Sequence, residues 1–494
     1  MEQGHGGSIC LSMSWVIMSE IVLECDTVII GAGTAGIEAY KAATEAGANC
    51  ILVESGPLGT SSRRTGDTPV SFLMEAGKKC HALMELDTYG ISPKSKVDIS
   101  LNTDHVLNNL RAARSKETGD VLSFIYRIPE TNRLIGKARF VDEHTIMVNE
   151  NFQVRFKSAV ISTGSAPVIP FELSRYGADS GVYTTNDFFD MDHLPNSIAV
   201  FGSNREGLQI GQALSYLGVK TVVFGSNRIW ELTDESVMHT TIDEFNERFD
   251  LVLNTYTTAI EKTSRGFSIY YLDHTNYENH LSVETILSAS IRCPKLEGLN
   301  IRSLGIKVDR FGCIDIKQNT LQTSVDHIFA AGEVTDLNMT VDFARYQGRL
   351  AGYNAANYPN MSTAKKPIKV NIMNTDPEVA MVGMSYEEVV ARAKTGRHFI
   401  AGEVRASEGM YRITKNDGGM MRIYCDEETK QILGAEMCLH NAGHIAHELA
   451  IAMAGNLTID EISRLPLFKP SYEEIIRSAC QSVSRNFIRK NAGS

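Results

Sequence analysis

The chain has no run of about 18 apolar residues, so no membrane-spanning helix is predicted. It also has no excess of basic residues, and its net charge of -11 argues against nucleic acid or an anionic membrane surface as a partner. Residues 9–18 are apolar, but no Lys or Arg precedes them and no clear cleavage site follows, so no secretory signal is predicted. We expect residues 1–17 to be an extension outside the fold, and a misassigned start is one explanation for it.

The cysteines are few and scattered. None of the nine has a second cysteine at the Cys-x-x-Cys spacing of a zinc site, and the chain is too long for a small disulfide scaffold. We therefore expect free thiols that pack as small hydrophobic side chains, no metal site and a cytoplasmic protein. At 494 residues the chain exceeds what one hydrophobic core supports, so two or three domains are expected.

A glycine-rich turn joins a strand to a helix near the N-terminus. The apolar residues 26–30 lead into Gly31-Ala32-Gly33-Thr34-Ala35-Gly36, followed by a helix to Ala46 and a strand that ends on Glu54. The three glycines permit a tight turn, close approach of a pyrophosphate, and packing of the helix on the strand. The helix N-terminus stabilises phosphate, and the acid accepts ribose hydroxyls, so a dinucleotide site is predicted here.

A second, degraded unit of this kind covers residues 197–223. Gly202-Ser203-Asn204-Arg205-Glu206-Gly207 opens its helix, and Asn204 replaces the middle glycine, so a pyrophosphate cannot approach the backbone as closely. No acid ends the next strand. Arg228 either holds a 2′-phosphate together with Ser226, which favours NADPH over NADH, or is a solvated surface charge.

The pattern changes at about Pro367. Residues 369–373, 422–425 and 432–437 are strand-like, whereas 386–393 and 442–454 are helical. We interpret this part as an antiparallel sheet with helices, in a separate α+β domain.

From about residue 24 to residue 484, the chain resembles the pyridine nucleotide-disulfide oxidoreductases, and dihydrolipoamide dehydrogenase most closely. Besides the glycine turns, the resemblance rests on residues 161–167 (ISTGSAP), 329–334 (FAAGEV), 374–380 (NTDPEVA) and 432–435 (ILGA). It implies an α/β fold of two Rossmann-type, three-layer dinucleotide-binding domains and a C-terminal α+β dimerisation domain. The implied divisions are an extension (1–17), an FAD-binding domain in two parts (18–168 and 295–365), an NAD(P)-binding-like domain (169–294) and an interface domain (366–494).

The resemblance implies FAD in the first unit and, less clearly, NADPH or NADH in the second. The implied FAD contacts are Gly31, Gly33, Thr34, Ala35, Gly36, Glu54, Gly59, Thr60, Thr163, Gly164, Gly332 and Glu333. The implied NAD(P) contacts are Gly202, Arg205, Gly207 and Arg228. Two of these depart from the family, because Glu333 stands where Asp is usual and Arg205 replaces the Tyr that gates nicotinamide.

The catalytic positions depart further. Aligned on Gly66 and Pro69, Ser62 and Asp67 occupy the places of the redox-active cysteines. An alcohol is a far weaker acid than a thiol, so the thiolate needed for disulfide exchange is missing. Dihydrolipoamide dehydrogenase activity is therefore not expected.

Three more family positions are changed. Lys469 replaces the His base in the segment that ends at Glu474. The family's buried Lys–Glu pair is replaced by Ser71 and Gln209. Losing one partner of such a pair costs about 3–5 kcal/mol, whereas replacing both can be near neutral, so a joint loss is the tolerated one.

Two functions fit these residues. The first is an NAD(P)H-dependent flavin oxidoreductase that passes electrons to a quinone, a dye or a second nucleotide instead of a disulfide. The second is a non-catalytic FAD-binding protein, acting as a subunit or a flavin sensor, which the degraded second unit favours. In either case a homodimer is expected, with Lys469 facing the partner's flavin, and no residue names the physiological acceptor.

Overall fold

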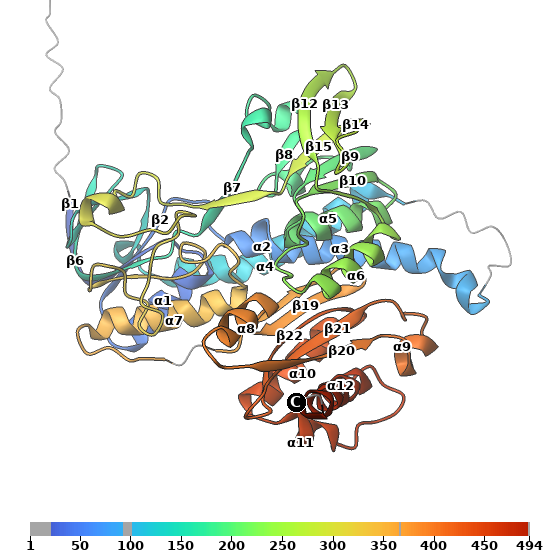
Figure 1. The fold of residues 1–494 in the computed structure, drawn as a ribbon. Helices are drawn as coiled ribbons and strands as arrows, with labels where there is room; N and C mark the ends of the chain where they lie inside the picture. The colour runs from blue at the N-terminus through green and yellow to red at the C-terminus, as the bar shows by residue number, and fades with distance from the viewer. Residues whose placement is uncertain (1–20, 92–100, 365–366, 493–494) are drawn as a thin grey trace, which may run out of the picture.

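The computed structural model describes residues 21–91, 101–364 and 367–492. They form three large sheets with their covering helices (Figure 1) and two smaller sheets, β12–β14 and the β7–β16 pair. The extension predicted at residues 1–17 lies outside the described residues. Among the described helices, none is long and apolar enough to cross a membrane. The cytoplasmic location and the domain boundaries stay predictions.

The first sheet carries the N-terminal glycine turn at the carboxyl end of its central strand. This strand, β1 (Ile21–Ile30), pairs in parallel with β2 (Cys50–Glu54) and β6 (Phe152–Ile161). Helices cover one face of the sheet. On the other face, apolar side chains of the sheet, including those of the β4–β5 hairpin that continues it beyond β6, cluster with the loop around Leu299. The other elements here are α2 (Ser61–Arg64), α3 (Asp67–Met84), α4 (Thr103–Arg127), β3 (Arg133–Ile135), β4 (Ala138–Asp142), β5 (Thr145–Val148) and β17 (Ile328–Ala330).

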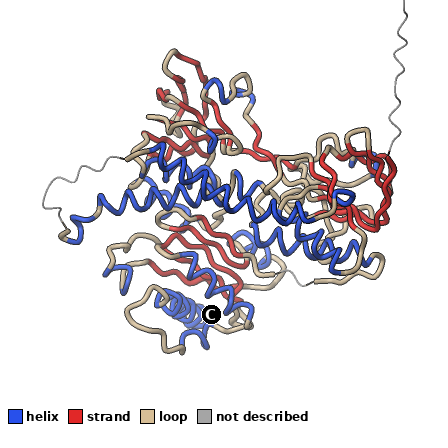
Figure 2. The backbone as a smooth tube through the Cα atoms, turned by 180° about the vertical axis from the view of Figure 1, so that it is seen from behind, coloured by secondary structure: helices blue, strands red, loops and turns tan. Residues whose placement is uncertain are grey.

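Two helices lie side by side on the covered face, α1 (Thr34–Glu45) and α7 (Val341–Asn357) (Figures 1 and 2). Their backbones approach closely because α7 presents glycines to α1. A Cβ atom at Gly352 would lie 2.1 Å from the carbonyl oxygen of Ala39. This contact holds α1, and with it the glycine turn, against the sheet.

The second sheet has five parallel strands in the order β11-β10-β9-β15-β8. Helix α5 (Arg205–Tyr216) begins at the second glycine turn, directly after β9 (Ser197–Phe201). The first glycine of that turn, Gly202, has φ +143°, and a Cβ there would lie 2.7 Å from the backbone of Ala289. The remaining elements are β8 (Val182–Thr184), β10 (Lys220–Gly225), α6 (Glu235–Asn246), β11 (Asp250–Leu253), β15 (Thr285–Ser288) and an antiparallel sheet of β12 (Tyr256–Thr263), β13 (Gly266–Leu272) and β14 (Glu278–Val283).

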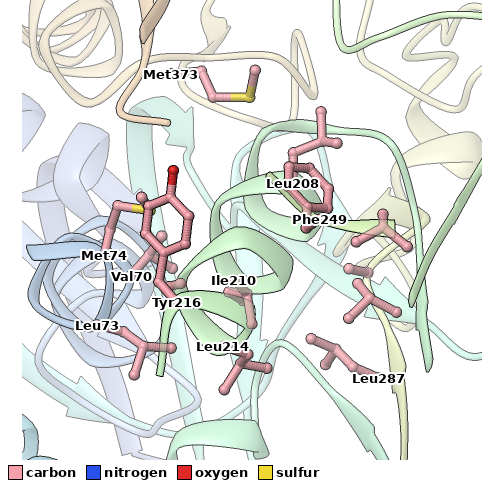
Figure 3. Packing of buried hydrophobic residues seen from close by; sticks show 14 of the residues in the cluster. Val70, Leu73, Met74, Leu208, Ile210, Leu214, Tyr216, Phe249, Leu287 and Met373 are labelled. Carbon is pink, nitrogen blue, oxygen red and sulfur yellow. The ribbon is translucent and has the colours of Figure 1, made fainter. Parts of the chain in front are cut away.

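Two contacts join the first and second sheets. Strands β7 (Ser165–Val168) and β16 (Ile291–Pro294) pair antiparallel where the chain passes between them. Helix α3 packs on α5 through apolar side chains that include Met74 and Tyr216 (Figure 3). Because a Cβ at Gly77 would lie only 3.0 Å from the carbonyl oxygen of Ala213, the two helices are in close contact.

The C-terminal sheet is antiparallel, with the order β18-β19-β22-β21-β20, which confirms the predicted α+β character of this part. Its helices bury an apolar cluster against one face of the sheet. The elements are β18 (Val370–Met373), β19 (Glu378–Gly383), α8 (Tyr386–Ala393), β20 (Phe399–Arg405), α9 (Gly409–Ile413), β21 (Met420–Asp426), β22 (Ile432–Leu439), α10 (Ala442–Ala454), α11 (Ile459–Ser463) and α12 (Glu474–Ala492).

A fully buried carboxylate ties the second sheet's loops to the C-terminal sheet. Glu436 of β22 is 0% exposed, and its Oε2 accepts the backbone N–H groups of Thr233 and Asp234, both at 2.9 Å. Its Oε1 accepts the Thr233 hydroxyl at 2.6 Å and the N–H of Tyr386 at 2.8 Å. Burial of this charge is tolerated because four donors surround it.

Replacing Glu436 with Gln is expected to lower the free energy of unfolding by about 1–3 kcal/mol. Whichever way the amide turns, its NH₂ group faces a backbone N–H that needs an acceptor. The measurement is the midpoint of thermal or urea unfolding.

The matched control is Glu403→Gln, because Glu403 contacts Arg422 at 2.9 Å from a partly exposed position. That change is expected to cost no more than about 1 kcal/mol. Equal unfolding midpoints for Glu436→Gln and the unchanged chain would contradict a stabilising role for the four hydrogen bonds to Glu436.

Candidate functional site

A cavity of about 1040 Å³, called the first cavity here, opens at the carboxyl ends of β1 and β6. Its volume is at the upper end of the roughly 300–1,000 Å³ typical of ligand pockets. The predicted contacts that line it are Gly31, Gly33, Glu54, Thr60, Thr163 and Gly164. A smaller space of about 100 Å³, the inner cavity, continues it and is lined by the predicted contacts Gly33, Thr34, Ala35, Gly164, Gly332 and Glu333.

The glycines of the first turn have different physical roles. A Cβ atom at Gly36 would lie 1.8 Å from the carbonyl oxygen of Gly31, so Gly36 is required for packing. At Gly33 a Cβ would meet only the Ser162 oxygen, at 3.8 Å, so this position borders open space. Gly59 lines neither cavity and lies beside the side chains of Thr118 and Arg64.

The N-terminus of α1 is open toward the first cavity. Its N-cap residue is Gly33, and no side chain caps the first turn. The first N–H groups of a helix need acceptors and attract anions. Nearby, Thr60 Oγ1 and Thr163 Oγ1 are buried and have no hydrogen-bond partner in the described part of the chain. The site therefore has unused hydrogen-bonding capacity.

Glu54 is fixed at the rim of this cavity by the backbone. Its Oε2 accepts the N–H of Ala32 at 2.6 Å, and its Oε1 accepts the N–H of Gly56 at 2.9 Å. The carboxylate thus stands beside the glycine turn, with lone pairs left for further donors.

At the inner cavity, Ser62 and Asp67 contact each other. The Ser62 hydroxyl donates to Asp67 Oδ2 at 2.7 Å, and Asp67 Oδ1 pairs with Arg205 Nη2 at 3.0 Å. Burial opposes the charge of Arg205, but Glu206 and Asp67 outweigh it and raise the pKa of this guanidinium. The charge of Asp67 is thus offset by Arg205 of α5.

The Asp67–Arg205 pair crosses from α3 to α5, the two helices on which Ser71 and Gln209 also lie. Ser71 is exposed and Gln209 is 5% exposed, and both border a narrow gap beside Arg205. A charge pair between the same two helices is therefore present, but at other positions than the family's Lys–Glu pair.

A second acid–arginine group, Glu333 with Arg292, also lines the inner cavity. Glu333 Oε2 accepts the Ser165 hydroxyl at 2.7 Å and lies 3.8 Å from Arg292 Nη2. Arg292 Nε also donates to Ser165 Oγ at 2.8 Å. The longer Glu333 side chain is thus held by the β7–β16 pair. Among the described residues, no cysteine lines the inner cavity.

The second glycine turn differs from the first at its helix N-terminus. The Asn204 side chain caps α5, because its Oδ1 accepts the N–H of Gly207 at 2.9 Å and its Nδ2 donates to the Ala289 carbonyl. The N–H of Gly207, which at an uncapped helix end would be free to bind a phosphate, is thus already hydrogen-bonded to Asn204. Trp230 lies nearby with φ +48°, a backbone conformation rare for a bulky residue. Its backbone N–H donates to the carbonyl oxygen of Ser203 at 2.7 Å.

Two cavities flank this second turn. The outer cavity, about 460 Å³, is lined by Gly202, Asn204, Ser226, Arg228 and Trp230, among others. The middle cavity, about 380 Å³, is lined by Arg205, Trp230, Arg292 and Glu333, and reaches the inner cavity's residues. Arg228 is mostly exposed and lies 3.7 Å from Glu387, which leaves both of its predicted roles open.

The C-terminal pair lies apart from these cavities. Lys469 Nζ contacts Glu474 Oε1 at 2.7 Å, and the lysine side chain is 70% exposed. Neither residue lines the four cavities described above. A role for Lys469 at a flavin therefore depends on a second subunit, and it stays a prediction.

Sequence comparisons place this architecture among known proteins. Residues 25–348 match the family described as "Pyridine nucleotide-disulphide oxidoreductase", and residues 371–480 match its dimerisation domain. The chain belongs to this family. The resemblance inferred from the sequence and the predicted fold class are thereby confirmed.

Characterised relatives span nearly the whole chain. A dihydrolipoyl dehydrogenase of Buchnera aphidicola subsp. Schizaphis graminum is 27% identical over 93% of this chain and 95% of its own. A mercuric reductase of Staphylococcus aureus is 25% identical over 89% of this chain and 79% of its own. Among solved structures, the HOCl-induced flavoprotein disulfide reductase RclA from Escherichia coli has a TM-score of 0.75 at 19% identity, covering 93% of this chain and all of its own. That likeness shows the fold.

Several residues of the site escaped the sequence analysis. Ser165 stands in a segment noted for its family pattern and Arg292 does not, and their contact with Glu333 joins residues far apart in the chain. Cys293 lines both the first and middle cavities, and no spacing signal pointed to it. Arg64 also lines the first cavity, at a position that the family resemblance did not mark as a contact.

Proposed function

We propose that the chain is an FAD-dependent oxidoreductase that takes electrons from NADPH or NADH and passes them to an acceptor other than a disulfide. The observation that carries this is the first cavity, at an uncapped helix N-terminus, beside an inner cavity without a cysteine. When bound, FAD supplies two-electron chemistry between a pyridine nucleotide and an acceptor. Family membership supports the oxidoreductase class and the cofactor class.

The residues present fit FAD. The open N-terminus of α1 and the free space at Gly33 suit the diphosphate, and Glu54 suits a ribose. Glu333, held by Ser165 and Arg292, is the acceptor for the ribityl chain toward the inner cavity. Ser62, Asp67 and Arg205 border the inner cavity, where they set a polar, charge-balanced surface instead of a thiol pair.

These side chains cannot perform disulfide exchange. The reaction requires a thiolate that attacks sulfur, and the Ser62 hydroxyl, even beside the Asp67 carboxylate, remains a far weaker acid than a thiol. The ion pair with Arg205 fixes the Asp67 carboxylate and offsets its charge. Asp67 therefore repels a negatively charged reduced flavin less strongly than an isolated carboxylate would.

The alternative is a non-catalytic FAD-binding protein. The Asn204 cap on α5 favours it, because that cap uses a donor otherwise available to a second pyrophosphate. The outer and middle cavities beside Trp230 favour the enzyme, since space for a second nucleotide remains. The two functions differ in whether NAD(P)H reduces the bound flavin.

Replacing Gly33 with Val is expected to give colourless protein, because the added side chain fills the open space at the α1 N-terminus without meeting the backbone. The ratio of FAD to protein is read from the absorbance spectrum. Gly119→Val is the control, since a Cβ at Gly119 meets nothing within 4 Å and lies in α4, away from the first cavity. Unchanged flavin content in Gly33→Val would sink the assignment of the first cavity.

Replacing Asn204 with Gly is expected to tighten NADPH or NADH binding roughly tenfold, because the N–H of Gly207 becomes free for a phosphate. Asn204→Asp is the control, which keeps a capping oxygen and adds a charge that repels phosphate. Each protein is titrated with both nucleotides under anaerobic conditions. Equal dissociation constants in all three would show that the cap does not limit binding.

Dihydrolipoamide turnover with NAD or NADP is expected to stay at background, while NADPH or NADH supports reduction of menadione or ferricyanide. No long-wavelength thiolate–flavin band is expected on two-electron reduction. The assays run beside an intact family member as a positive control. Comparable dihydrolipoamide turnover would defeat the proposal, and no reduction by either nucleotide would favour the non-catalytic alternative.

A homodimer is also proposed. The C-terminal part matches the family's dimerisation domain and exposes large apolar side chains, with Phe468 76%, Ile451 72% and Ile488 69% exposed. Obligate interfaces commonly bury above about 2,000 Å². Sedimentation at micromolar concentration is expected to give a dimer, and a monomer there would exclude it.

A further inference from the structure

Arg64 is a half-buried cation on the wall of the first cavity. It ends the short helix α2, and its Cδ lies 3.4 Å from where a Cβ of Gly59 would be. Its Nε is buried without a hydrogen-bond partner, and its terminal nitrogens have none among the described residues. A guanidinium stays charged in proteins, so it is costly to bury without an anion.

The two acids with the strongest electrostatic influence on Arg64, Asp190 and Glu54, form their direct contacts with other groups. Asp190 pairs with Arg114 at 2.7 Å, and both oxygens of Glu54 accept backbone N–H groups of the rim. Burial lowers the pKa of Arg64, although Asp190 and Glu54 act in the opposite direction. Within the described chain, Arg64 therefore has no acid paired directly with it.

The neighbouring arginine is arranged differently. Arg63 Nη1 donates to the Glu117 carbonyl at 2.6 Å and lies 3.8 Å from its carboxylate. Arg63 does not line the first cavity, whereas Arg64 does. Of the two adjacent arginines, Arg63 thus contacts Glu117, whereas Arg64 faces the first cavity.

We propose that Arg64 binds the diphosphate of the dinucleotide in the first cavity. This rests on the proposed FAD function, because the diphosphate is the anionic part of FAD. The open N-terminus of α1 at Gly33, which suits that group, borders the same cavity as Arg64. A guanidinium forms short, charge-assisted hydrogen bonds to phosphate oxygens and often binds two of them at once.

The other cations on this cavity wall are less suited to the role. Lys137 and Lys295 are exposed, so water solvates their charge. Arg139 lies 3.5 Å from Glu150 at an exposed position. Arg64 combines partial burial, a place on the wall and a missing partner.

The test compares the unchanged chain with Arg64→Gln, Arg64→Lys and the matched control Arg63→Gln. Flavin-depleted full-length protein is titrated with FAD, ADP and adenosine by calorimetry. Arg64→Gln is expected to weaken FAD and ADP binding by roughly 10- to 100-fold, because a hydrogen bond to a charged group is lost. Adenosine, which has no phosphate, is expected to bind within twofold of the unchanged chain. Arg64→Lys recovers part of the affinity, and Arg63→Gln changes nothing.

The three ligands separate this inference from the proposed function. ADP binding that is lost in Arg64→Gln supports the role of Arg64, even when the unchanged chain does not retain FAD and the proposed function fails. ADP affinity within twofold in Arg64→Gln overturns the inference, whether or not FAD binds. An equal loss for adenosine also overturns it, because the substitution then acts on the shape of the cavity rather than on phosphate charge. An unchanged chain that binds neither FAD nor ADP overturns both.

Discussion

The packing of α3 on α5 is the contact on which the site depends. Apolar side chains between the helices, such as Met74 and Tyr216, bring two segments far apart in the sequence into one place (Figure 3). The first residue of each helix then faces the other, Asp67 on α3 and Arg205 on α5. Their pairing at 3.0 Å follows from the packing and bridges the two nucleotide-binding units at the inner cavity.

The two glycine turns show how one residue changes a binding site without changing the fold. Both turns have a first glycine at positive φ and a last glycine pressed against its carbonyl, so both helices start alike. Gly33 leaves the α1 N-terminus open, whereas Asn204 supplies the α5 N-terminus with its own acceptor. A helix end that is already capped is a weaker anion site, because phosphate has to compete with the cap.

Much of the fold was predictable from the sequence because its signals are local. Strand, glycine turn and helix follow one another at residues 26–46, and the predicted helices at 386–393 and 442–454 match α8 and α10. The antiparallel strands β12–β14 were not predicted. Most side chains of β12 and half of those of β14 are exposed, so few apolar residues marked these two strands. The site was predictable only in part, since the contacts of Glu333 with Ser165 and Arg292 depend on tertiary pairing.

The buried Glu436 clamp has a mechanical consequence for the loop after β10. That loop carries Trp230 between the middle and outer cavities. It is anchored by Glu436 at Thr233 and also by Glu231, whose Oε2 accepts Asn371 Nδ2 at 2.5 Å and lies 3.3 Å from Lys369 Nζ. A ligand that displaces the Trp230 loop therefore has to move or break its hydrogen bonds to β18 and β22 of the C-terminal sheet. Ligand binding in these cavities is thus mechanically coupled to the C-terminal sheet, which belongs to the part of the chain proposed to contact a second subunit.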